Sequence, residues 1–172
     1  MYILSQISVV LSDALFASTY IVKKKNILLI LNVLNNFFFG IHFLLLKSIT
    51  AAYSVFLTIV FLIAIYLLER FKQEKFSFII SILCSICLIV ITIFTWDGAL
   101  ALLPVIGIFL VFVGTLFKNT LLVKCFYFIS TVLNTIYMFF IHSYFGFALN
   151  LVILAIAIFG IINHIRTQNK KV

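Results

Sequence analysis

Charged residues are scarce in this chain, and acidic ones are the scarcest. Asp, Glu, Lys and Arg together make up 9% of the 172 residues, and only four residues are acidic. Soluble domains carry about a quarter of their residues as charged ones. Hydrophobic residues fill 66% of this sequence, which is more apolar surface than a water-soluble fold can bury. The chain is therefore predicted to lie almost wholly inside a lipid bilayer.

Motifs of catalysis, metal binding and nucleic-acid binding are also missing. The sequence holds no HExxH, no glycine-rich phosphate loop and no spacing typical of zinc ligands. The three cysteines lie inside apolar runs, where they are expected to be small buried hydrophobes. The basic residues, which give a net charge of +8, sit at the ends of apolar runs without a shared patch. We expect no enzyme activity, no cofactor or metal site and no nucleic-acid partner.

Seven apolar runs of about twenty residues are present, the length of a helix that crosses a bilayer. Backbone polar groups must be satisfied within each segment in hydrocarbon, so all seven runs are predicted helices. The first run is expected to stay attached as a span, because its charges follow the apolar stretch instead of preceding it. The prediction is one all-α membrane domain over residues 1–172, with spans at 3–22, 26–46, 49–68, 76–95, 99–117, 120–141 and 144–164.

The basic residues occupy every second gap between these spans. Lys47 alone lies on the opposite side. Because cationic residues gather at the cytoplasmic face, the pattern predicts an outer N-terminus and a cytoplasmic C-terminus. Eleven residues carry this signal: Lys23, Lys24, Lys25, Arg70, Lys72, Lys75, Lys118, Lys124, Arg166, Lys170 and Lys171.

The two ends of the chain resemble each other when the sequence is moved along itself by 95 residues. This shift places Lys23 on Lys118 and Ser48 on Ser143. Each half has a basic first turn and a short polar second turn. We therefore predict two parallel three-helix repeats, 1–70 and 99–166, joined by a linker helix over 76–95.

Polar residues inside the spans indicate a site at mid-depth. Asp13 is the one carboxylate there, and burying it costs roughly 2.5–3.5 kcal/mol. Spans one and two turn near Lys24, so Asp13 lies level with Asn35 and Asn36, whose amides can donate to it. The predicted substrate-binding residues are Asp13, Asn32, Asn35, Asn36, Thr131 and Asn134.

Other positions have simpler interpretations. His42 and His142 lie near the outer ends of their spans and are expected at the membrane interface. Pro104, the only proline, and Gly107 are predicted to ease movement of span five.

Three stretches resemble the YgjV family of bacterial inner-membrane proteins. They are Lys23–Lys25 followed by the Asn-rich span that ends in His42–Leu46, then Thr95–Gly98 leading to Leu103–Gly107, and His142–Gly146 continuing to Asn150. The family resembles the SWEET sugar facilitators and PnuC vitamin-precursor transporters in span count and repeat plan. This chain lacks their Pro-Gln pair and paired-Trp motif, so no binding residue is carried over.

The leading hypothesis is a facilitator of a small polar solute in the bacterial inner membrane, with a cavity between the two repeats. Asp13 would orient the solute or carry a proton. The alternative is a membrane interaction or assembly protein whose polar residues only hold helices together. The bilayer is the expected partner in both cases, and the oligomeric state is left open.

Overall fold

The chain folds into helices wherever a span is predicted. The computed structural model describes residues 2–169, and this part contains helices and turns but no strand. Lys170 and Lys171, counted above among the basic residues, lie outside the described residues. The helices are α1 (Tyr2–Ile21), α2 (Lys25–Leu45), α3 (Ile49–Arg70), α4 (Ser77–Phe94), α5 (Leu102–Thr115), α6 (Thr120–Phe140) and α7 (Tyr144–Asn169), with 3-10 turns η1 (Glu74–Phe76) and η2 (Ala99–Ala101).

Six of these helices are long and apolar enough to cross a membrane. The seventh, α5, has only 14 residues, or about 21 Å at the rise of an α-helix. Together with η2 it forms a 17-residue apolar helical segment, Ala99–Thr115. A hydrocarbon core is about 30 Å thick, which is longer than α5. The membrane crossing at 99–117 therefore stays a prediction, whereas the other six helices have the required length.

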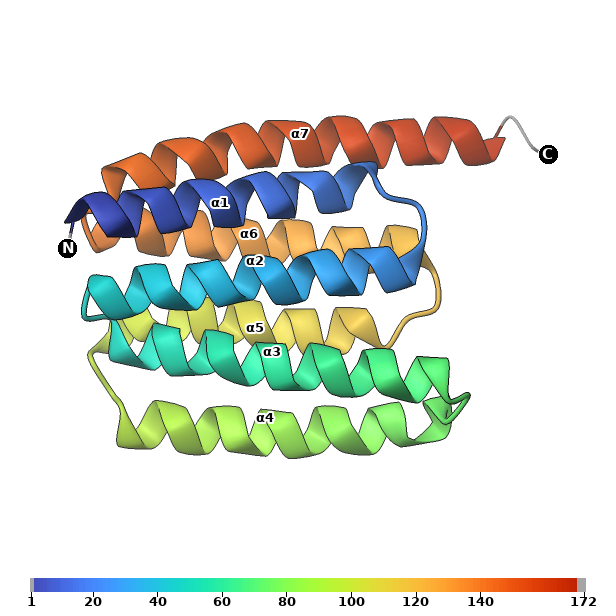
Figure 1. The fold of residues 1–172 in the computed structure, drawn as a ribbon, viewed down its shortest axis with the longest axis horizontal. Coiled ribbons are helices and arrows are strands. Elements are labelled where there is room, and N and C mark those ends of the chain that lie inside the picture. Colours follow the sequence, from blue (N-terminus) through green and yellow to red (C-terminus); the bar gives the residue numbers. More distant parts are fainter. Residues whose placement is uncertain (1, 170–172) are drawn as a thin grey trace.

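Six helices form a closed ring, and α4 lies outside it. Around the ring each helix contacts the next in the order α1, α2, α3, α5, α6, α7 and back to α1. Helix α4 packs against α3 and α5, and Figure 1 shows it at one edge of the bundle. Only Ser81, Leu88 and Thr92 of α4 are buried, and Ile80 and Cys84 also pack against the core. Most of its other apolar side chains face outward, where lipid would cover them.

The basic residues gather at one end of this bundle. Helix α1 begins at one end and α7 ends at the other, so every second loop returns to the end where α7 finishes (Figure 1). Lys47 lies in a loop at the end where α1 begins. Nine of the eleven basic residues lie in the described part, at the α7-terminal end: Lys23, Lys24, Lys25, Arg70, Lys72, Lys75, Lys118, Lys124 and Arg166.

Two turns have the same backbone structure at positions 95 residues apart. After α2, Lys47 has a φ of 61° and the amide of Ser48 donates to the carbonyl of Phe43 at 3.0 Å. After α6, His142 has a φ of 58° and the amide of Ser143 donates to the carbonyl of Met138 at 3.0 Å. A left-handed residue with this hydrogen bond is the Schellman ending of a helix. The turn geometry therefore agrees with the alignment of Ser48 with Ser143.

Helices α5 and α6 approach closely at Gly114. A Cβ atom there would lie 2.4 Å from the Cβ of Phe126, which moves only with the α6 backbone. At Gly40 the obstacle is the far end of the Phe56 ring, at 2.8 Å, and a ring can turn aside.

We predict that Gly114→Ala destabilises the folded protein by about 1–3 kcal/mol, because α5 and α6 must separate to admit the methyl group. Gly40→Ala is the matched control, and its loss should be smaller because the Phe56 ring can turn aside, while alanine favours the helix equally at both positions. Thermal unfolding in detergent, followed by circular dichroism, measures both. Equal midpoints for the two variants would contradict the close approach at Gly114.

Candidate functional site

The polar side of α1 faces the interior of the ring. Its spacing of seven residues brings Ser5, Ser12 and Thr19 onto one face, and all three are at most 1% exposed. Asp13 lies beside them and is 7% exposed. Hydrocarbon offers no hydrogen-bond partner, so a helix with one polar side turns that side towards other helices. The carboxylate therefore lies inside the bundle.

A small cavity lies within the ring, and all six predicted binding residues line it. Its volume is about 50 Å³, enough for a few water molecules but far below the roughly 300–1,000 Å³ of a typical ligand pocket. Every ring helix contributes to the wall. The lining residues are Asp13, Phe16, Asn32, Asn35, Asn36, Phe39, Val55, Thr58, Pro104, Ile108, Val111, Ser130, Thr131, Asn134 and Asn150.

Much of the hydrogen-bonding capacity of the wall is used locally. The hydroxyl of Ser12 donates to Oδ1 of Asn35 at 2.6 Å and joins α1 to α2. The amide of Asn36 donates to the carbonyl of Asn32 one turn earlier, at 2.7 Å. The hydroxyl of Thr131 does the same with the carbonyl of Tyr127, at 2.7 Å. These donors are thus occupied by protein acceptors.

Two acceptors on the wall have no partner in the protein. They are Oδ2 of Asp13 and Oδ1 of Asn134, each buried without a hydrogen bond. Neither Asn35 nor Asn36 forms the expected bond to this carboxylate oxygen. A buried acceptor without a donor costs about 1–3 kcal/mol. Water, a hydrogen-bond-donating solute or a cation in the cavity would satisfy both oxygens.

Pro104 and Gly107 occupy ordinary positions for their residue types. Pro104 lies in the first turn of α5, where its missing N–H interrupts no helix hydrogen bond. A Cβ atom at Gly107 would lie 3.0 Å from the hydroxyl of Ser130, so this glycine lets α5 approach α6. Pro104 lines the cavity, but α5 is unbroken around it. The hinge role of both residues stays a prediction.

His42 lies near the outer end of α2, but its side chain is fully buried between helices instead of open to water. Its Nδ1 lies 2.8 Å from the hydroxyl and 3.0 Å from the carbonyl oxygen of Ser5. A carbonyl only accepts, so Nδ1 carries the proton and donates to Ser5. Nε2 then accepts from the hydroxyl of Ser143, at 3.4 Å. His42 thus ties α1 and α2 to the turn before α7.

Three polar residues of the cavity wall are not among the predicted binding residues. They are Thr58 of α3, Ser130 of α6 and Asn150 of α7. Asn150 is the one amide in the apolar first half of α7 and is 3% exposed. An isolated amide within such a helix was the available signal. Within the described chain, no three His, Cys, Asp or Glu side chains gather where they could hold a metal ion.

Fold and composition together define a multi-pass α-helical membrane protein. Comparison with family models gives a match over residues 3–168. The chain belongs to the Imp-YgjV family, described as bacterial inner membrane protein. The resemblance inferred from the sequence is thereby confirmed. No curated protein and no solved structure matches the chain.

We predict that Asp13→Asn stabilises the protein by about 1–2 kcal/mol, because the amide is uncharged and brings donors to a wall with unpaired acceptors. Thermal unfolding in detergent measures the change. Asp97→Asn, in the exposed turn between α4 and η2, serves as the control and should leave the midpoint unchanged. A lower midpoint for Asp13→Asn would mean that the carboxylate itself holds the bundle together.

Proposed function

We propose that the protein is a facilitator of a small polar solute or cation, which binds in the cavity inside the ring. The observation that carries the proposal is the pair of unpartnered oxygens on Asp13 and Asn134, which line one buried space. Membrane proteins avoid ionisable side chains in mid-bilayer unless the group binds a partner or has a function. Both oxygens accept hydrogen bonds, so the solute should carry donors or positive charge.

We further infer that the ring consists of two parallel three-helix repeats, α1–α3 and α5–α7, with α4 as the linker. Two helix starts and two turn structures support this. Helices α6 and α7 begin 95 residues after α2 and α3, and α3 contacts α5 as α7 contacts α1. Seven of the nine buried positions of α2 recur in α6 at the same offset; among them, Asn32, Asn36 and Phe43 correspond to Tyr127, Thr131 and Met138.

This arrangement offers a route for transport. In parallel-repeat transporters, the two halves move against each other around a site at mid-membrane. The cavity lies between α2 and α6, the middle helices of the two repeats, and has walls from both. At about 50 Å³ it admits only water or a small ion, so a larger solute requires the halves to separate. We propose that the structure represents an occluded state of such a cycle.

We also propose that the basic end of the bundle faces the cytoplasm, as the charge distribution favours. A cysteine at Asp97 should react with a membrane-impermeant maleimide in intact spheroplasts, because that turn lies at the other end. A cysteine at Lys72 should react only after lysis. Both positions are exposed, so access alone decides the outcome. The reverse pattern would invert the proposed orientation.

For the transport proposal, we predict that purified protein in liposomes raises the flux of protons, cations or small hydrogen-bond donors above that of empty vesicles. Asp13→Asn should reduce this flux at least about tenfold, because it removes the charge that attracts the solute. Asp97→Asn is the matched control and should keep the wild-type rate.

Two results would reject the proposal. One is a flux equal to empty vesicles across the panel. The other is an Asp13→Asn variant that transports normally. In either case the polar residues would serve only to hold helices together, as the alternative of an interaction or assembly protein requires. The stability measurement on the same variant shows separately whether it is folded.

A further inference from the structure

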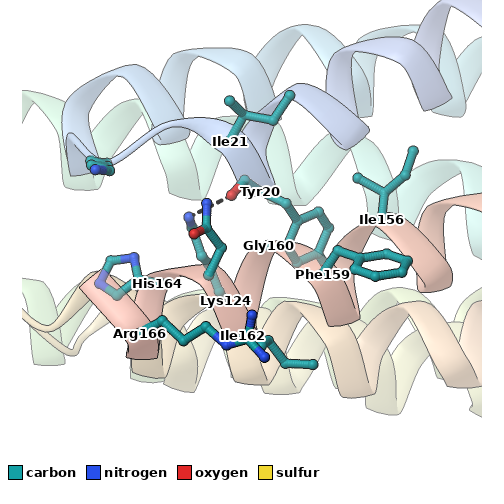
Figure 2. Close-up of a pocket in the computed structure, with 11 residues that line it drawn as sticks. Tyr20, Ile21, Lys124, Ile156, Phe159, Gly160, Ile162, His164 and Arg166 are labelled. Atoms are coloured by element: carbon teal, nitrogen blue, oxygen red, sulfur yellow. Dashed lines mark hydrogen bonds between the residues drawn. The ribbon is translucent and has the colours of Figure 1, made fainter. Parts of the chain in front are cut away.

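A second, larger pocket lies at the basic end of the bundle, away from the proposed transport site. Its volume is about 500 Å³, and it lies between the end of α1, the start of α6 and the end of α7 (Figure 2). It has the size of a typical ligand pocket. Its walls are Tyr20, Ile21, Lys23, Lys124, Ile156, Phe159, Gly160, Ile162, Asn163, His164 and Arg166.

Positive charge dominates the polar part of this pocket. Lys23, Lys124 and Arg166 contribute three cations, and no Asp or Glu lies among the lining residues. The charges of Lys23 and Lys124 repel each other. An anion placed between them would relieve this repulsion.

Lys124 is held in place by the fold. Its side chain is 1% exposed, and Nζ donates to the carbonyl of Tyr20 at 2.7 Å, joining α6 to the end of α1. An ammonium group has three N–H donors, and this bond uses one. Gly160 lets α7 pack closely against the end of α1, because a Cβ atom there would lie 3.0 Å from the carbonyl oxygen of Tyr20. The lysine is therefore a fixed cation in the wall and not a mobile surface chain.

The wall also has an apolar part, which is open to the outside of the bundle. Ile21 is 77% exposed and Phe159 is 74% exposed. Both lie on helices of membrane-spanning length, so these exposed side chains can contact lipid. In Figure 2 the nitrogen-bearing side chains of Lys124, His164 and Arg166 lie towards one end of the pocket, and Ile156 and Phe159 lie towards the other. Such a surface offers charge to a headgroup and apolar contact to acyl chains.

We infer that this pocket binds an anionic phospholipid, with its phosphate held by Lys23, Lys124 and Arg166 and its acyl chains against Ile21 and Phe159. A basic pocket between helices at the membrane surface is suited to an acidic headgroup. The pocket opens beside the lipid-facing side chains of Ile21 and Phe159, so a phospholipid can place its headgroup in the pocket while its acyl chains stay in the bilayer, which favours a lipid over a soluble phosphate. Binding would join α1 to α7, where the two proposed repeats meet.

Native mass spectrometry of the full chain in detergent tests this inference. Phosphatidylglycerol and phosphatidylcholine with identical acyl chains are added at increasing concentrations. We expect one phosphatidylglycerol to be retained at concentrations where phosphatidylcholine is not. The double variant Lys23→Gln with Arg166→Gln should weaken retention about thirtyfold, because each basic residue near an anionic lipid contributes roughly fivefold.

The matched control is Lys72→Gln with Lys75→Gln, which removes two charges at the same end of the bundle, outside the pocket. This control should retain phosphatidylglycerol as the wild type does. Equal retention of the two lipids, or equal loss in both double variants, would overturn the inference. Displacement of the lipid by millimolar inorganic phosphate would also overturn it, because it would indicate a site for a soluble anion.

Discussion

The whole arrangement depends on one constraint: hydrocarbon offers polar groups nothing to bond with. Helix backbones satisfy their polar groups with hydrogen bonds inside each helix, but the side chains of Asp13, Asn35 and Asn134 need partners from elsewhere. These groups must face one another, and this requirement rotates α1, α2 and α6 so that their polar sides line the interior of the ring. Helix α4 has only two buried polar residues, Ser81 and Thr92, so few of its side chains need polar partners. It lies outside the ring. The polar side chains, not the apolar ones, therefore specify which helices become neighbours around the cavity.

The features that could be predicted from the sequence are those that depend on segment length and on position along one hairpin. Apolar runs between charged turns gave the seven helices to within a few residues, because leaving the helix in lipid costs several kcal/mol per unpaired backbone group. The depth of Asp13 relative to Asn35 and Asn36 followed from counting residues on either side of the Lys24 turn, and all three line one cavity. The basic gaps likewise placed the cationic loops at one end. Each of these inferences needs only local geometry.

The features that could not be predicted depend on partners from distant segments. Lys124 was counted with the basic residues of the cytoplasmic end, yet it is buried, and its Nζ donates a hydrogen bond to the carbonyl of Tyr20, 104 residues earlier. His42 was expected to be open to water near the end of its span, yet Ser5 and Ser143, from two other parts of the chain, contact its ring and it is buried. Periodicity in one helix carries no information about such contacts. The volume of the cavity was equally out of reach, since it depends on how closely six helices approach.

The proposed repeats are alike in backbone but unlike in chemistry, and this difference bears on mechanism. The position 95 residues after Asp13 is Ile108, which is buried and lines the same cavity. The position 95 residues before Lys124 is Leu29, which is fully buried. Asp13 and Lys124 therefore each correspond to an apolar residue in the other repeat. Because the only carboxylate of the cavity belongs to α1, a bound cation would stay with the first repeat while the second moves past it. In the proposed cycle, movement of the second repeat would change access to the site without breaking the strongest contact to the solute, as a rocking mechanism requires.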